Sequence, residues 1–297
     1  MMKLKEQRWT DRAFMIFVYG FLTLFFLAVL FPLVFVLNAS ISDPQAVIRG
    51  QVFLWPVGFT LKGYKAVFAY HRLMTGFGNS FFYMVVGTCI NIAMTMLCAY
   101  PLSRPQFPAR RFVSLILMFT MIFSGGLIPT FIVVDRLGLT NTRWAMLIPA
   151  AMSVWNVMIA RTYISHTIPN ELYEAAEIDG SSPIHFFTSC VLPLSKPIIA
   201  VLVLYYGVGH WNAYFNALIY LRNPSLFPLQ LVLRDILVVN KIDPTLITSA
   251  EALAAKQGMQ DLLKYSVIVV ASVPVLLIYP MVQRYFVQGV MIGSLKG

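Results

Sequence analysis

The chain has 297 residues, of which 59% are hydrophobic and 11% charged, and its formal net charge is +10. A composition this apolar excludes an ordinary soluble domain and is typical of a protein that crosses the membrane several times. The basic residues form no basic-aromatic cluster, so we expect membrane lipid and no nucleic acid among the partners. The cysteines form no CxxC pair and the histidines are scattered, which predicts neither a disulfide framework nor a metal site.

Six apolar runs are long enough to cross a bilayer, because about 20 helical residues at about 1.5 Å each span its hydrocarbon core. The first run follows a basic tail and lacks the short apolar region and cleavage site of a secretory signal, so we interpret it as an uncleaved span. We predict an all-α membrane protein with six transmembrane helices. The expected spans are Phe14–Leu37, Phe77–Tyr100, Phe112–Val134, Trp144–Tyr163, Pro197–Leu221 and Tyr265–Gln283.

Two parts of the chain are expected. Residues 1–74 would hold the N-terminal tail, the first span and an outer loop, and residues 75–297 would form a core with the other five spans. In the third span, Ser124, Gly125 and Gly126 predict a broken or kinked helix. Such a break is tolerated at membrane depth where it is buried or lines a cavity.

The spans carry few groups that are capable of chemistry. No Asp or Glu lies in the middle of a predicted span, whereas an ion-coupled transporter or a membrane-embedded enzyme usually needs such a group. The phosphate-binding pattern GxxxxGK[ST] is absent, so we do not expect the chain to hydrolyse ATP by that route. We therefore assign it no catalytic residue and no bound cofactor, and a partner must supply the energy for any driven step.

Aromatic and amide side chains gather in the fifth span, and a smaller group lies in the fourth. On one continuous helix Asn212 and Asn216 share a face, as do His210 and Tyr214. Because an aromatic ring can stack on a sugar ring while amides bond to its hydroxyls, these residues are candidates for a saccharide path. The alternative is that they join and pack the helices. The candidates are Trp155, Asn156, His210, Trp211, Asn212, Tyr214 and Asn216.

One polar segment, residues 169–197, interrupts the apolar chain, and we call it the acidic loop. Pro169 fits the first turn of a helix and Gly180 a left-handed residue that ends it. The predicted helix is amphipathic, with its glutamates on one side and an apolar side formed by Leu172, Ala175 and Ala176. We expect the Asp179 carboxylate to accept hydrogen bonds from the amides that follow it.

A second short helix should follow in the acidic loop. Ser182 is placed to cap it, Pro183 to open it and Pro193 to end it. On these features alone, the segment is equally well interpreted as a solvated hairpin between two spans. The residues of interest are Glu171, Glu174, Ala175, Ala176, Asp179, Gly180 and Pro193.

The acidic loop resembles the EAA signature of ABC importer permeases. The likeness consists of Glu174-Ala175-Ala176, then Asp179-Gly180, then Leu192-Pro193, placed between two apolar runs. From about residue 75 onward the layout is similar to MalG-like permeases of carbohydrate importers. The runs SGGLIPTFIVVDRLGLTNTRWAMLIPA and WNAYFNALIYL are similar to a subgroup linked with complex or oligomeric saccharides, including acidic ones.

This resemblance implies a fold, a function and partners. The fold would be that of a type I ABC importer permease, with a cytoplasmic coupling helix in the acidic loop. The chain would pair with a second, different permease and bind two cytoplasmic ATPase subunits that bind ATP and Mg. It would receive sugar from an extracytoplasmic solute-binding protein. Sugar would cross by alternating access, and the loop over residues 222–264 would face the binding protein.

Orientation follows from the motif, because half of the 22 Lys and Arg residues fall on each side. With the acidic loop in the cytoplasm, four crossings precede it and both termini are cytoplasmic, in a bacterial plasma membrane. Three alternatives stay open: an ABC permease for another solute, an ion-coupled secondary transporter and a membrane-embedded enzyme.

Overall fold

The computed structural model describes residues 9–236, 261–277 and 280. Within these ranges the chain is helical and contains no β-strand. It divides into two compact units, unit 1 with residues 1–70 and 240–272 and unit 2 with residues 71–239 and 273–297. The division of the sequence at residue 74 stays a prediction.

Unit 1 contains α1 (Trp9–Ser40), α2 (Pro44–Ile48), α3 (Lys62–Ala69) and part of the helix over residues 261–277. Two hydroxyl contacts join these elements at the end of α1. Ser40 Oγ is 2.8 Å from Tyr64 Oη, and Ser266 Oγ donates to the Ser40 carbonyl at 3.3 Å. Gly63 allows this approach, because a Cβ there would meet Leu262 and Ser266.

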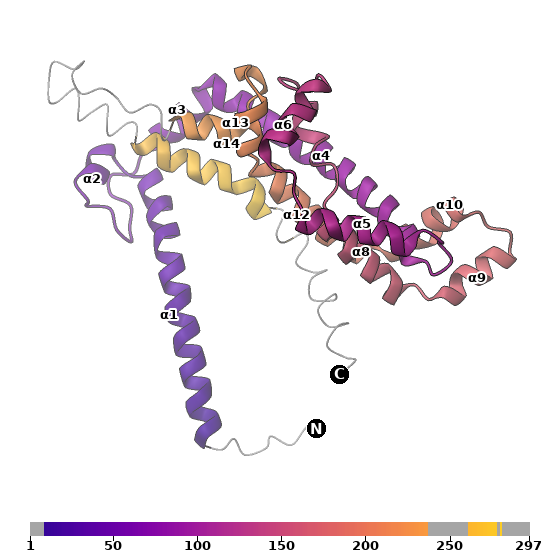
Figure 1. Ribbon diagram of the computed structural model, residues 1–297. Coiled ribbons are helices and arrows are strands. Elements are labelled where there is room, and N and C mark those ends of the chain that lie inside the picture. The colour runs from indigo at the N-terminus through magenta and orange to yellow at the C-terminus, as the bar shows by residue number, and fades with distance from the viewer. Residues whose placement is uncertain (1–8, 237–260, 278–279, 281–297) are drawn as a thin grey trace. The chain divides into compact units, whose positions relative to one another are not determined.

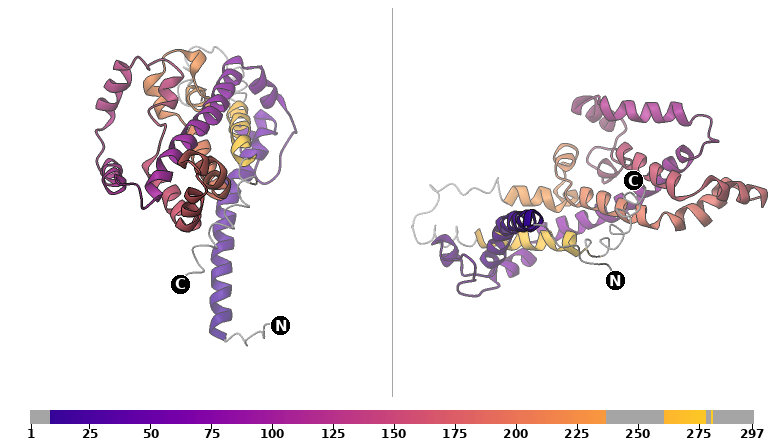
Figure 2. Two further views of the ribbon diagram at one scale, coloured as in Figure 1. Left: turned by 90° about the vertical axis from the view of Figure 1, so that its right-hand side faces the viewer. Right: turned by 90° about the horizontal axis from the view of Figure 1, so that it is seen from below.

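Unit 2 is built on α4 (His71–Ser103), and the helices α8 (Val154–Thr167) and α12 (Lys196–Trp211) pack against it. Figures 1 and 2 show these three helices together, with α9 (Asn170–Ile178) and α10 (Pro183–Phe186) at one end of the unit. The helix α13 (Phe215–Tyr220) and α14 (Leu229–Arg234) lie away from that end (Figure 1).

A buried core lies where α4, α8 and α12 meet. Its fully buried members come from all three helices, with Met96 and Leu102 on α4, Val157 and Ile164 on α8, and Leu202 on α12. Small residues at the contacts, as expected between membrane helices, bring the backbones close. Ala99 of α4 and Ala160 of α8 are both fully buried in this core.

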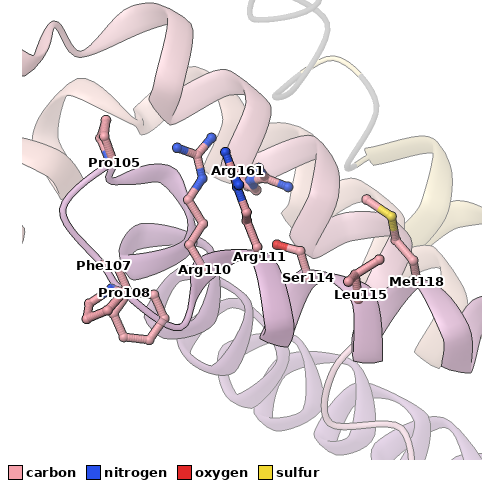
Figure 3. A pocket seen from close by; sticks show the side chains of 9 residues that line it. All are labelled: Pro105, Phe107, Pro108, Arg110, Arg111, Ser114, Leu115, Met118 and Arg161. Carbon is pink, nitrogen blue, oxygen red and sulfur yellow. The ribbon is translucent and has the colours of Figure 1, made fainter.

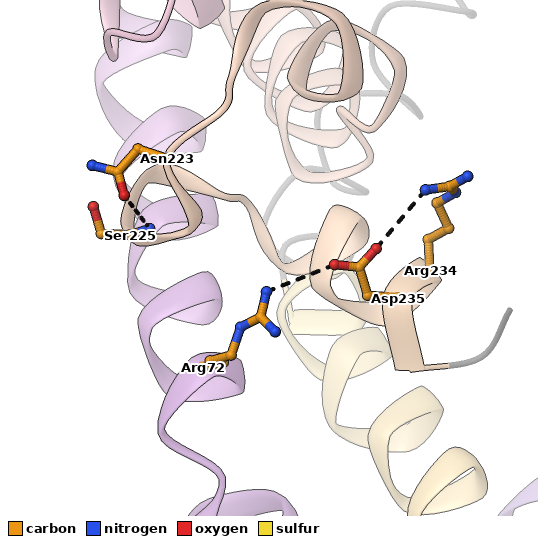
Figure 4. A network of polar contacts seen from close by, with 5 residues as sticks. All are labelled: Arg72, Asn223, Ser225, Arg234 and Asp235. Carbon is orange, nitrogen blue, oxygen red and sulfur yellow. Dashed lines mark hydrogen bonds and ion pairs between the residues drawn. The ribbon is translucent and has the colours of Figure 1, made fainter. Parts of the chain in front are cut away.

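The first half of α4 also holds the segment that leads into α14. Asn79 Nδ2 donates to the carbonyls of Ser225 and Phe227 at 2.7 and 3.1 Å, and the Leu229 amide donates to Ser80 Oγ at 2.8 Å. At the end of α14, Asp235 lies 3.7 Å from Arg72 of α4 and 3.8 Å from Arg234 (Figure 4). The start of the predicted loop over residues 222–264 is therefore fixed to α4, whereas residues 237–260 of that loop lie outside the described residues.

Two predicted spans are single long helices. The run Phe14–Leu37 lies within α1, and Phe77–Tyr100 lies within α4. These are the two described helices that are long and apolar enough to cross a membrane. Tyr265–Leu277 of the sixth run is helical, while residues 278–279 and 281–283 lie outside the described residues.

The third run is broken, as predicted. The helices α5 (Arg110–Ile122) and α6 (Leu127–Arg136) meet at 116°. Gly126, with φ of 86°, lies at the break. Such a φ favours glycine, because an L side chain would crowd the backbone there.

The fourth and fifth runs are not the single helices that we expected, and these two predictions are wrong. The fourth run is divided between α7 (Trp144–Leu147) and α8, because Pro149 follows α7 and lacks the amide that would continue its hydrogen bonds. The fifth run is divided between α12 and α13. Asn212 ends α12, and its Nδ2 donates to the Val208 carbonyl at 3.0 Å, a local bond that competes with helix continuation.

Candidate functional site

The acidic loop begins with a helical hairpin whose turns are set by its sequence. In α9, Pro169 is the N-cap and Asp179 the C-cap, and Gly180 has φ of 76°. The Gly180 amide donates to the Glu177 carbonyl at 3.0 Å and the Ser181 amide to the Ala176 carbonyl at 2.9 Å. This pair of bonds is a Schellman motif, so the left-handed glycine predicted here is confirmed.

The expected role of Asp179 in the turn is not observed. The helix carbonyls already accept the amides of Gly180 and Ser181, and among the described residues the Asp179 carboxylate makes no hydrogen bond. The Asp179 side chain is exposed. Ser182 does cap the next helix as predicted, since its Oγ accepts the His185 amide at 3.2 Å.

The second helix of the hairpin is longer than predicted. From α10 it passes through a π-helical turn over Phe187–Val191 into α11 (Leu192–Leu194), and it bends by 78° into α12. Pro193 therefore lies inside this helix and does not end it. Because Pro193 has no amide to donate to the carbonyl four residues earlier, a local departure from α-helical bonding fits this position.

The face of α9 that packs on the rest of unit 2 differs from the predicted apolar face. Tyr173 and Ala176 contact the buried core, whereas Leu172 is 41% exposed and Ala175 is exposed. The glutamates Glu171, Glu174 and Glu177 are exposed, as expected. The outer side of the hairpin also carries apolar side chains, since Ile178 is 87% and Ile184 77% exposed.

Arg104, which the sequence did not single out, joins α4 to the acidic loop. The side chain follows the last residue of α4 and is buried, with its guanidinium carbon 5.5 to 5.7 Å from the ring centroids of Tyr100, Tyr173 and Phe186. This is the distance range of cation–π contacts. Burial lowers the pKa of Arg104, although a guanidinium stays charged at neutral pH.

The aromatic contacts of Arg104 tie both arms of the hairpin to α4, because Tyr173 belongs to α9 and Phe186 to α10. Gln106 adds a polar link, donating from Nε2 to Asn170 Oδ1 at 3.0 Å, while Asn170 Nδ2 donates to Glu174 Oε1 at 2.6 Å. A displacement of the hairpin would thus be passed to the end of α4.

A second candidate site is a cavity of about 310 Å³, which we call the central cavity. Its lining comes from α4, α7, the segment that leads into α8, α12 and α13. Asn91 and His210 form one side, with His210 Nε2 2.7 Å from Asn91 Oδ1, and Asn91 Nδ2 donates to the Ala150 carbonyl. The Tyr206 side chain of α12 extends to the start of α8, where its hydroxyl accepts the Ser153 amide at 3.2 Å.

The predicted pathway residues come together only in part. His210 and Asn216 line the central cavity. Trp211 is buried with its ring edge-on to Phe77, and Tyr214 packs in a separate apolar cluster. The remaining three candidates, Trp155, Asn156 and Asn212, do not line the cavity. Because Asn212 and Asn216 lie on either side of a helix break, they do not share a helical face, which corrects the prediction.

No group of His, Cys, Asp and Glu residues suited to a metal ion occurs within the described part of the chain. Arg161 of α8 is held by α4, since its Nε donates to the Leu102 carbonyl at 3.0 Å.

Comparison with known proteins gives this geometry a family. Residues 74–292 match the family described as "Binding-protein-dependent transport system inner membrane component". Protein LplC of Bacillus subtilis is 38% identical over 267 residues, which are 90% of this chain and 89% of that protein. The polygalacturonan/rhamnogalacturonan transport system permease protein YtcP of the same organism is 37% identical over 97% of this chain and 99% of that protein.

A solved structure is also similar. One chain of a bacterial ABC transporter involved in the import of the acidic polysaccharide alginate superposes with a TM-score of 0.86 at 33% identity, over 94% of this chain and 98% of that chain. The resemblance inferred from the acidic loop is thereby confirmed at the level of the family. This chain belongs to the family of inner membrane components of binding-protein-dependent transport systems, the permeases of ABC importers.

Proposed function

We propose that this chain is one permease subunit of an ATP-driven importer that carries acidic oligosaccharides into the cytoplasm. The observation that carries the proposal is the 33% identity over 94% of the chain to a subunit of the alginate importer. The polygalacturonan/rhamnogalacturonan permease, at 37% identity, supports the same substrate class. Alginate and polygalacturonan are both polyuronates, so a chain of sugar carboxylates is the shared feature.

The proposed membrane arrangement has six spans. Counting each bent helix pair as one span gives up to four in the described residues, namely α1, α4, the α5–α6 pair and the pair that ends in α12. The short α8 and the last helix complete six. At about 1.5 Å per residue the 14 residues of α8 reach only about 21 Å, so its span would include the segment before it. With the acidic loop in the cytoplasm, both termini are cytoplasmic.

In this arrangement the hairpin of the acidic loop is the surface to which the ATPase subunits bind. Its outer side combines exposed glutamates with Ile178 and Ile184, which are 87% and 77% exposed. Apolar side chains of this size, exposed beside charges, are typical of a docking surface. Arg104 then links the docked hairpin to α4, which contributes to the central cavity.

The complete transporter would contain a second permease, two ATPase subunits that bind ATP and Mg, and an extracytoplasmic solute-binding protein. The family's dependence on a binding protein supports the last of these partners. ATP binding would close the ATPase subunits, and this closure would move the hairpin and turn the cavity outward to receive sugar. ATP hydrolysis would then return the transporter to its starting conformation. The chain itself does no covalent chemistry.

The experiment is ATP hydrolysis by the purified complex in nanodiscs with its binding protein. Oligogalacturonates or oligoalginates should stimulate hydrolysis, and neutral maltooligosaccharides should not. Stimulation by neutral sugars alone would overturn the acidic substrate, whereas an absence of stimulation by all saccharides would overturn the sugar importer.

A further inference from the structure

A basic pocket of about 840 Å³ lies beside the acidic loop and has no part in the proposed transport mechanism. Its lining comes from the connection between α4 and α5, the first turns of α5, and α8. Figure 3 shows the side chains of Arg110, Arg111 and Arg161 gathered in the middle of the lining, with Ser114 beside them and Leu115 and Met118 further along α5.

The three arginines of the basic pocket are not neutralised within the described part of the chain. None of them forms an ion pair there, and the positive charges of Arg110 and Arg161 are close enough to repel each other. Three positive charges around one pocket repel each other, so this arrangement is unfavourable unless an anion is bound between them. The Arg161 bond to the Leu102 carbonyl holds that guanidinium in place through Nε.

Ser114 gives a second and independent indication of a ligand. Its residue is 6% exposed, and its hydroxyl lies in the lining of the pocket without a hydrogen-bond partner. A buried hydroxyl without a hydrogen-bond partner is unfavourable, because it has lost its bonds to water. A ligand with acceptor oxygens would satisfy Ser114 and the arginines together.

The apolar end of the pocket distinguishes between possible anions. Leu115 is 66% and Met118 43% exposed, and both lie beyond the arginines along the same helix. Phe112 and Phe119 of α5 are also exposed, at 68% and 61%. A free phosphate has nothing to place against these side chains, whereas a lipid has acyl chains. Basic pockets between membrane helices are suited to acidic lipid headgroups.

We propose that the basic pocket binds one anionic phospholipid, with its phosphate between Arg110, Arg111, Arg161 and the Ser114 hydroxyl, and its acyl chains along Leu115 and Met118. The bound lipid neutralises the arginines next to the connection that carries Arg104. The site is thus a lipid-binding site adjoining the proposed coupling segment, and its ligand class is phosphatidylglycerol-like.

The test uses the complete transporter, titrated with phosphatidylglycerol, phosphatidylcholine or inorganic phosphate and observed by native mass spectrometry, which also reports whether all subunits are assembled. The double variant Arg110→Gln/Arg111→Gln should lower phosphatidylglycerol affinity about 25-fold, from about fivefold for each arginine near a membrane surface. Arg110→Lys/Arg111→Lys should keep most of the affinity. Arg136→Gln, an exposed arginine outside the pocket, is the matched control and should change nothing.

The outcomes separate the possible ligands. The proposal is supported if wild type prefers phosphatidylglycerol to phosphatidylcholine and the assembled double Gln variant loses that preference. It is overturned if the two lipids bind equally to wild type, if Arg136→Gln has the same effect as the double variant, or if inorganic phosphate displaces the lipid better than chloride at equal ionic strength. If the double Gln variant does not assemble, Ser114→Val must reduce the preference, and an unchanged preference in that variant overturns the proposal.

Discussion

Replacing Gly180 with valine tests whether the turn of the acidic loop transmits force. Gly180 has φ of 76°, and a Cβ there would meet no atom within 4 Å, so the substitution acts through the backbone alone. A left-handed conformation costs an L residue about 1–2 kcal/mol, and more for a β-branched side chain. With every ~1.4 kcal/mol equal to a factor of ten, about 2 kcal/mol lowers the population of the native turn roughly 30-fold relative to competing conformations.

The expected result is a complex that assembles but hydrolyses ATP without importing substrate, because α9 has no buried residue that would enforce the turn. The assays are uptake of labelled oligosaccharide and ATP hydrolysis in the same proteoliposomes. Gly180→Asn is the conservative variant, since Asn tolerates positive φ, and it should keep most of the coupling. Gly78→Val is the matched control, at a glycine that also has open space but ordinary φ. Wild-type coupling in Gly180→Val would refute the reasoning.

Three further predictions concern contacts that hold unit 2 together. Arg104→Ala should release the hairpin and speed hydrogen exchange of α9 amides, whereas Arg104→Met, which fills the same aromatic cage, should change exchange much less; equal exchange in both variants would contradict this role. Gly87→Ala places a Cβ against the His210 ring and should lower stability by about 1–3 kcal/mol in thermal unfolding, unlike Gly78→Ala. Asn141, with φ of 58°, accepts the amides of Arg222 and Asn223 on Oδ1 at 3.0 and 2.8 Å. Asn141→Ala should therefore destabilise more than Asn141→Gly, which loses the acceptor but keeps the backbone freedom.

Features that depend on neighbours in the chain were predictable from the sequence. Gly180, Ser182 and the break at Gly126 all follow from local backbone preference, and the structure has each of them as expected. The long helices α1 and α4 follow from apolar runs, residues 14–37 and 77–100, that no charged residue interrupts. The family could be recognised for the same reason, because its signature lies in one continuous segment.

Features that depend on distant parts of the chain were not predictable. The helical face of α9 was assigned to Leu172, but Tyr173 is the residue that packs, because Arg104 and Phe186 offer it an aromatic and cationic partner. The continuous fifth span was expected from hydropathy, which does not register the Asn212 bond that ends α12. The role of Arg104 could not be predicted from the sequence, where it is one of several arginines between two spans. Its aromatic partners come from three separate segments of the chain.

The residues that the sequence predicts to line a saccharide path do not all lie at one site in the fold. Of the aromatic and amide cluster in the fifth run, His210 and Asn216 reach the central cavity, and Trp211 is buried at a helix contact. Asn91, which bonds to His210, was absent from the sequence prediction because it lies 119 residues away. That His210 and Asn216 contact sugar stays a prediction. The variants His210→Ala and Asn216→Ala test it directly.

Uptake into proteoliposomes tests the central claim most directly. The complete transporter is reconstituted with its binding protein outside and ATP or a non-hydrolysable analogue inside, in the presence or absence of an ion gradient. We predict uptake of labelled oligogalacturonate that requires ATP hydrolysis and is lost in Gly180→Val. Uptake that an ion gradient drives without ATP would contradict the account.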